Sequence, residues 1–182
     1  MPEAEILSSY AVPTEPMTVR IERMLPGPIE RAWAWLTESD LRRRWLAAGE
    51  MDLRVGGRVD LIWRNDELTD HQETRPEGFD EEHRMQNVIT RIDAPRLLAF
   101  GWGESAEVTF ELEPAGDEVR LTLTHRRLPS RAMMVMVGAG WHAHLDLLVA
   151  GAKGEALPPF WSHWLKLRAE YEARLPHESG MR

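Results

Sequence analysis

The stretch GAGWHAHLDLL, residues 138–148, decides the fold that we expect, because it is the best-defined helical segment of the chain. At 100° per residue, several apolar side chains fall within about 40° of Trp141 on a helical projection. The members of this stripe are Met134, Val137, Leu145, Leu148 and Ala152. The periodicity therefore predicts a long helix over residues 131–153, with one apolar face packed on a sheet.

The two histidines of this stretch do not have the spacing of a helical metal site. His142 and His144 are two residues apart and so point in nearly opposite directions, whereas a helical zinc pair needs a spacing near four. His142 shares a polar flank with Asp146, and His144 lies at the edge of the apolar stripe. We therefore expect no metal ligand here. His144 is a core histidine or, if it faces a cavity, the best acid–base group of the helix.

Gly138 and Gly140 are unusual inside a helix, where each costs roughly 1 kcal/mol relative to alanine. They can mark a kink, a close approach of another element, or room for a ligand. Tight packing is the interpretation that we favour.

Upstream of the helix, the pattern alternates with a period of two, which is typical of strands. Residues 17–25 predict a first strand, followed by two short helices over residues 29–36 and 40–47, with the run Arg42-Arg43-Arg44 on a solvated face. The further predicted strands cover residues 51–55, 59–63, 83–93, 97–102, 106–113 and 119–125. After the long helix, residues 160–175 predict another helix. This order indicates an α+β fold in which a curved antiparallel sheet wraps around a long C-terminal helix.

The expected domain organisation is one domain over residues 17–175. Residues 1–16 contain three prolines and little periodicity, and are expected to form a flexible N-terminal arm. Residues 176–182 are expected to fray. Residues 65–82 are polar and acidic and predict a mobile loop between strands.

Composition excludes several classes of function. The net charge of −8 argues against nucleic-acid binding, which draws on clustered basic residues. The absence of cysteine excludes disulfides, thiolate nucleophiles and cysteine-type zinc sites. The sequence has no signal-like N-terminus and no run near the ~18 apolar residues of a membrane span. It also has no nucleotide-binding fingerprint. We expect a cytoplasmic protein without a cofactor, a nucleic-acid partner or a membrane partner.

Four segments together resemble a known family. They are IERMLPGPIERAWAWLTESDLRRRW (residues 21–45), the turn Gly56-Gly57-Arg58-Val59, RIDAPRLLAFGW (residues 91–102) and GWHAHLDLL (residues 140–148). In order and spacing they resemble the START-like helix-grip (SRPBCC) superfamily, and within it bacterial proteins similar to the C-terminal domain of the activator of heat-shock-protein-90 ATPase. The resemblance implies a seven-stranded sheet gripping the C-terminal helix, two small helices after the first strand, and often an apolar cavity. It implies no single activity, because the superfamily contains both carriers and enzymes.

The residues themselves favour a cavity of aromatic character, since tryptophan and methionine suit a site for an apolar molecule. The side chains that we expect to contact a hydrophobic or aromatic ligand are Trp45, Trp63, Met85, Trp102, Met134, Trp141 and His144. The same side chains can instead fill a solid core, so both interpretations stay open.

Two other functions stay open. One is a cyclase- or hydrolase-like enzyme that uses His144. The other is a protein-interaction module, either one resembling the chaperone-ATPase activator or a regulatory one, although we expect no stimulation of a chaperone ATPase by this single domain. Leu147 and Val149 lie off the main stripe. They are covered either by residues 157–164 or by a second subunit, which leaves a homodimer possible.

Overall fold

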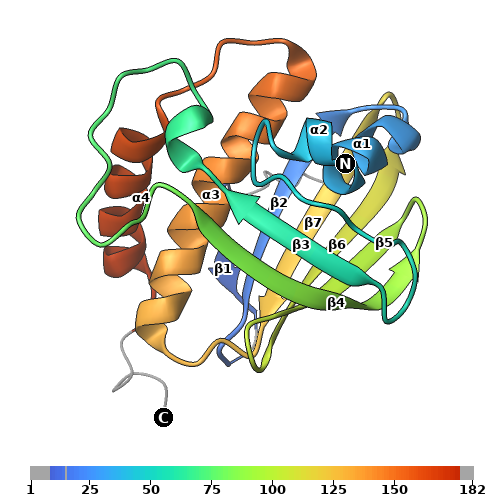
Figure 1. Cartoon of the computed structure of the whole chain (residues 1–182), viewed down its shortest axis with the longest axis horizontal. Helices are drawn as coiled ribbons and strands as arrows, with labels where there is room; N and C mark the ends of the chain where they lie inside the picture. The colour runs from blue at the N-terminus through green and yellow to red at the C-terminus, as the bar shows by residue number, and fades with distance from the viewer. Residues whose placement is uncertain (1–8, 15, 177–182) are drawn as a thin grey trace, which may run out of the picture.

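A curved antiparallel sheet, crossed by a long helix, is the framework of the computed structural model, which describes residues 9–14 and 16–176 (Figure 1). The strand order is β1-β2-β7-β6-β5-β4-β3, and every neighbouring pair is antiparallel. The strands are β1 (Val12–Pro13), β2 (Val19–Pro26), β3 (Arg58–Trp63), β4 (His83–Asp93), β5 (Leu97–Trp102), β6 (Ala106–Ala115) and β7 (Glu118–Arg126). The α+β helix-grip prediction is confirmed.

The helices are α1 (Ile29–Thr37), α2 (Ser39–Arg42), α3 (Arg131–Lys153) and α4 (Phe160–Arg174), with a short 3-10 turn η1 (Asn65–Glu67). Helix α3 has the predicted bounds, and both of its ends are capped. The Ser130 hydroxyl accepts a hydrogen bond from the Met133 amide at 3.1 Å, and Gly154 ends the helix in the left-handed conformation with φ 70°. The cap residues thus fix where the helix starts and stops.

Helix α3 lies between the concave face of the sheet and helix α4 (Figure 1). Its sheet-facing stripe is buried as predicted, with Leu145 and Leu148 fully inaccessible. Leu147, off that stripe, is only 1% exposed, so this single chain buries it without a second subunit. By length and hydropathy alone α3 could cross a membrane, but most of its apolar window is buried inside the protein, which is the position of a core helix.

The seventh strand is not the one that the sequence predicted. Residues 51–55 form no regular strand, and only isolated bridges such as Met51 to Val59 join this segment to β3. The backbone turns at residues 54–57, where the Gly57 amide donates to the Arg54 carbonyl, and Val55 is 63% exposed, so no core contact holds it in a sheet. The prediction for residues 51–55 is therefore wrong, and β1 completes the sheet.

The predicted terminal segments lie partly outside the described residues. Residues 1–8 and 15 of the expected arm, and residues 177–182 of the expected frayed end, belong to the part that the structure does not describe. Within the described part, Val12–Pro13 pairs with β2, and the Ala11 amide donates to the Tyr171 hydroxyl at 2.6 Å. The Pro176 carbonyl accepts a hydrogen bond from Arg131.

The prediction that the arginine run lies on a solvated face is wrong for Arg42. Its side chain is 1% exposed, and the guanidinium donates to the carbonyl oxygens of Leu36, Thr37, Ala47 and Gly49. Burial lowers its pKa to about 10, so it stays charged at neutral pH. Arg43 and Arg44 are exposed, as predicted. Arg42 therefore ties the end of α1 to the segment that leads into β3.

Candidate ligand-binding cavity

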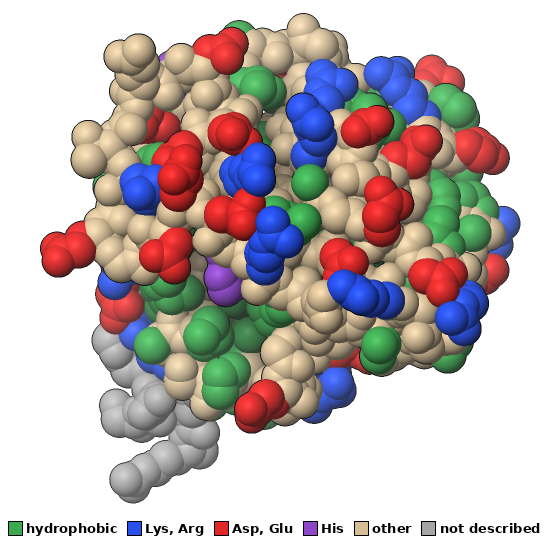
Figure 2. Space-filling view, viewed as in Figure 1, with side chains coloured by type: hydrophobic (Ala, Val, Ile, Leu, Met, Phe, Trp, Pro, Cys, Tyr) green, Lys and Arg blue, Asp and Glu red, His purple; other side chains and the backbone are tan. Residues whose placement is uncertain are grey.

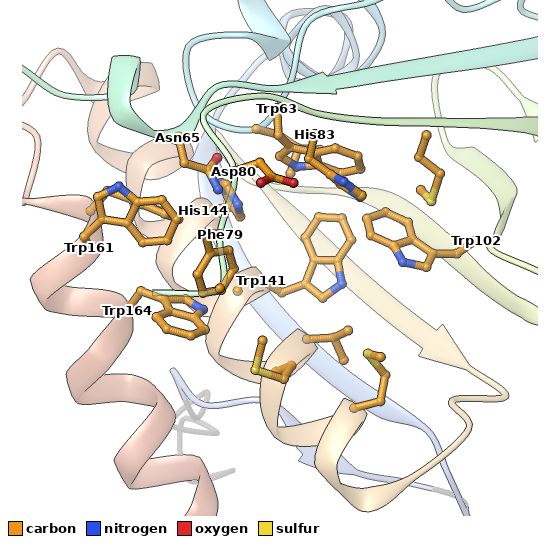
Figure 3. A pocket seen from close by; sticks show the side chains of 18 residues that line it. Trp63, Asn65, Phe79, Asp80, His83, Trp102, Trp141, His144, Trp161 and Trp164 are labelled. Carbon is orange, nitrogen blue, oxygen red and sulfur yellow. The ribbon is translucent and has the colours of Figure 1, made fainter. Parts of the chain in front are cut away.

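A cavity of about 390 Å³ lies between the concave face of the sheet, α3, α4 and the loop that follows η1 (Figure 3). This volume is within the range of small-molecule sites in proteins. The cavity is lined by Leu46, Trp63, Asn65, Gly78, Phe79, Asp80, His83, Met85, Trp102, Met133, Met136, Val137, Gly140, Trp141, His144, Phe160, Trp161 and Trp164. On the face in Figure 2, hydrophobic side chains gather beside a histidine over the first half of α3.

Aromatic rings form two opposite walls of the cavity. On the sheet side, the Trp102 ring centroid lies 5.5 Å from that of Trp63 and 5.4 Å from that of Trp141. On the α4 side, the Phe79 ring lies 5.0 Å from Trp161 and 4.9 Å from Trp164 (Figure 3). These are ordinary distances for edge-to-face and tilted aromatic pairs. Aromatic side chains thus line the cavity on both sides.

Five of the seven residues expected to contact a ligand line this cavity. Trp63, Met85 and Trp102 come from β3, β4 and β5, and Trp141 and His144 come from α3.

The structure places the other two, Trp45 and Met134, in the solid core. Trp45 is fully buried, with its ring edge on Phe110 and its indole N–H donating to the Trp35 carbonyl at 2.9 Å. Met134 is 1% exposed and does not reach the cavity. A residue on the inward face of its element need not border the cavity, because the core fills part of the concave face.

His144 lines the cavity and is held in one orientation. Its Nδ1 lies 2.7 Å from the Trp45 carbonyl oxygen, and its ring lies 4.8 Å from Phe160. A carbonyl oxygen only accepts, so Nδ1 carries the proton, and Nε2 of the neutral ring offers a lone pair. Burial lowers the pKa of His144 to about 4, although the Trp45 carbonyl opposes this shift. At neutral pH the ring is therefore a hydrogen-bond acceptor rather than a strong base.

A polar edge of the cavity was not found from the sequence. Asn65, Asp80 and His83 lie along one side of it (Figure 3). The Asn65 Oδ1 atom is buried and has no hydrogen-bond partner among the described residues. A buried acceptor without a partner is costly, and a donor group on a bound molecule would remove that cost.

Residues 65–82 were expected to form a mobile loop, yet the structure bonds this loop to α4. The Glu73 carboxylate accepts hydrogen bonds from the backbone amides of Trp161 and Ser162 at 2.9 and 2.8 Å. Asp66 accepts from the Trp161 indole N–H at 2.8 Å. The loop thereby satisfies the open amides at the start of α4 and carries Phe79 into the cavity wall. Phe79 is an apolar aromatic residue in a largely polar and acidic segment, and this was the sequence signal that could have predicted its contact with the core.

The two glycines of α3 have different surroundings. A Cβ atom added at Gly138 would lie 3.3 Å from the Tyr171 ring, so this glycine allows the close approach of α4. A Cβ atom at Gly140 would meet nothing within 4 Å, and Gly140 lines the cavity. Tight packing against α4 explains Gly138, whereas Gly140 borders open space.

The profile of the family described as Activator of Hsp90 ATPase homolog 1-like protein matches residues 26–153, which is most of the chain. No curated protein matches the sequence.

Solved structures extend the likeness beyond this segment. A protein of Bordetella parapertussis, solved by NMR, shares 41% identity over 94% of this chain and 93% of its own, with a TM-score of 0.77. CalU16 from Micromonospora echinospora shares 26% identity over 86% of each chain, with a TM-score of 0.64. An AHSA1-like protein from Aeromonas hydrophila, at 22% identity over 76% of this chain and 94% of its own, has a TM-score of 0.59 and so supports the fold alone.

Proposed function

The chain belongs to the Activator of Hsp90 ATPase homolog 1-like family, and from this premise we propose that it binds an aromatic small molecule in the cavity between the sheet and the C-terminal helices. The observation that carries the proposal is the pair of facing aromatic walls around about 390 Å³ of open space. Flat ligands gain the most from such walls, because ring–ring contacts add to the free energy of apolar burial.

The polar edge defines the ligand further. Asn65 and His144 both line the cavity and both carry an acceptor atom, Oδ1 and Nε2, so the ligand that we propose carries a hydroxyl or N–H donor on an otherwise apolar ring system. A long acyl chain matches the aromatic walls less well. The proposed class is therefore a fused or substituted aromatic compound with one or two donor groups.

The test uses 2-naphthol as an aromatic probe with a donor and laurate as the acyl alternative. Quenching of tryptophan fluorescence and isothermal titration calorimetry report binding, because Trp63, Trp102 and Trp141 line the cavity. We expect saturable 1:1 binding of 2-naphthol and at least tenfold weaker binding of laurate.

A matched pair of variants locates the binding. Gly140→Leu places an isobutyl group in the open space, and Ala132→Leu adds the same kind of bulk at an exposed position of the same helix. We expect Gly140→Leu to weaken binding at least tenfold and Ala132→Leu to leave it unchanged, with both variants folded by circular dichroism. Absence of 2-naphthol binding to the parent, or equal binding by both variants, would overturn the proposal.

A catalytic role for His144 is the second candidate, favoured by its place at the cavity surface with Nδ1 fixed by Trp45. A hydrolase-like role requires Nε2 to accept a proton from water or from a substrate. The test compares hydrolysis of 4-nitrophenyl acetate by the parent and by His144→Gln. A parent rate above that of the variant supports this candidate, and equal rates exclude it for this class of ester.

A further inference from the structure

Two histidines and an aspartate meet at the junction of α3 and α4, away from the cavity. The Nε2 atom of His163, on α4, lies 2.8 Å from Oδ2 of Asp146, on α3. The Nε2 atom of His142, one helical turn before Asp146, lies 3.5 Å from the same oxygen. One ligand atom from each of the three side chains lies within 4.8 Å of the others. None of the three residues lines the cavity; His142 points from α3 toward Tyr171 on α4, whereas His144 points toward the Trp45 carbonyl.

These separations are close to those of a metal site. With bond lengths of about 2.0–2.2 Å to histidine nitrogen and carboxylate oxygen, the ligand atoms of a tetrahedral zinc ion lie roughly 3.4 Å apart. Small rotations of the three side chains would bring the atoms to these positions. A helical i, i+4 pair joined by a third ligand from a neighbouring helix is a geometry that side chains in a helix bundle can supply.

An outer layer of contacts holds the candidate ligands. The Nδ1 atom of His142 lies 3.0 Å from the Tyr171 hydroxyl, which directs Nε2 toward Asp146. Asp146 uses its other oxygen, Oδ1, for Arg23, whose Nη2 is 3.1 Å away. Tyr10 packs its ring edge against the His142 ring at 4.9 Å. Such outer contacts orient the ligands of protein metal sites.

We propose that His142, Asp146 and His163 bind one divalent ion of the late first-row transition series, with Zn²⁺ as the representative. Two imidazoles and one carboxylate oxygen favour such an ion over Mg²⁺ or Ca²⁺, which prefer oxygen ligands. The side chains of Asp146 and His163 are each 28% exposed, so an ion and a fourth ligand from solvent have access.

The experiment titrates the tag-free chain with Zn²⁺, and with Mg²⁺ as the comparison ion, by calorimetry and thermal unfolding. We expect 1:1 binding of Zn²⁺ with a Kd in the micromolar range or below, a higher Tm, and no effect of Mg²⁺. His163→Ala and Asp146→Asn should each weaken Zn²⁺ binding at least tenfold. His71→Ala removes an exposed histidine outside the cluster and should leave the affinity unchanged.

Two further readouts separate ligation from a general effect on folding. Co²⁺ should give the visible absorption of a four-coordinate site in the parent and in His71→Ala, and lose it in His163→Ala. Tyr171→Phe removes the contact on His142 Nδ1 and should weaken Zn²⁺ binding by about 10-fold or more. No Zn²⁺ binding by the parent, or equal affinity in His163→Ala and His71→Ala, would overturn the proposal. Gly140→Leu should bind Zn²⁺ like the parent. A failure of the metal-site proposal can therefore be distinguished from a failure of the proposal that the cavity binds an aromatic ligand.

Discussion

The indole N–H of Trp141, on α3, donates a hydrogen bond of 3.0 Å to Nδ1 of His125, on β7. Since Nδ1 accepts, the proton of the neutral His125 ring is on Nε2, which is buried without a hydrogen-bond partner among the described residues. Burial lowers the pKa of His125 to about 3. This contact joins α3 to β7, and burial keeps the imidazole uncharged in the folded protein.

Stability should fall as the pH is lowered from 7 toward 4. His125, His142 and His144 have pKa values of about 3, 4 and 4 in the folded protein, whereas an unfolded histidine titrates near 6.5. The unfolded chain therefore binds protons in this window that the folded chain does not. Each such proton lowers the free energy of unfolding by up to about 1.4 kcal/mol per pH unit. Urea unfolding at pH 7, 6 and 5 measures the slope, and a flat profile would contradict the assignment of neutral buried rings.

Gly140→Ala should stabilise the protein by about 0.5–1 kcal/mol, because alanine favours the helix and the added methyl group has free space. Gly138→Ala is the matched control, since its methyl group would lie 3.3 Å from the Tyr171 ring and its helical gain should be offset. Thermal unfolding of both variants checks that Gly140→Ala has the higher Tm. A higher Tm for Gly138→Ala than for Gly140→Ala would show that the space around the two glycines has been assigned wrongly.

Glu73→Ala should loosen the start of α4 and cost about 1 kcal/mol, the usual effect of losing an N-terminal cap. Burial raises the pKa of Glu73, but the hydrogen bonds from Ser162 and Trp161 outweigh it and lower the pKa below its ordinary value. Hydrogen exchange of the Trp161 and Ser162 amides should be faster in this variant. Glu77→Ala, at an exposed position of the same loop, should leave both amides protected.

Arg42→Lys should destabilise the protein by about 2 kcal/mol or more, because an ammonium group cannot reach all four carbonyl oxygens that the guanidinium serves. Arg43→Lys, on the exposed side of the same segment, should change the free energy of unfolding by less than about 0.5 kcal/mol. Chemical denaturation of the two variants gives the comparison. Equal stabilities of Arg42→Lys and Arg43→Lys would mean that water hydrogen-bonds to the four carbonyl oxygens in place of the guanidinium.

Local periodicity was enough to predict the sheet side of the cavity. Trp63, Met85 and Trp102 face inward because strand residues alternate, and Trp141 faces the sheet because of its helical position. The same alternation predicted a strand over residues 51–55, where the backbone instead begins to turn at Arg54 and Val55 is exposed.

The other side of the cavity depends on contacts between distant segments, which periodicity does not reveal. Phe79 reaches the cavity because its loop is bonded to α4, about 90 residues later, through Glu73 and Asp66. His163 meets Asp146 because α4 packs on α3. Arg42 is buried although its two neighbours are exposed, since three-dimensional packing places carbonyl oxygens around it. The arginine run was predicted to be solvated because it is charged, although the carbonyl partners of Arg42 lie only five to seven residues away.

The bonds between Glu73 and the start of α4 connect the loop that carries Phe79 to this helix. Moving the loop away from α4 would break three hydrogen bonds, namely those from the Trp161 and Ser162 amides to Glu73 and that from the Trp161 indole to Asp66. The amides at the start of α4 would then lose their side-chain partners as Phe79 left the cavity wall. A molecule that packs against both Phe79 and Trp161 would hold loop and helix together, so occupancy of the cavity and order at this end of α4 would rise together.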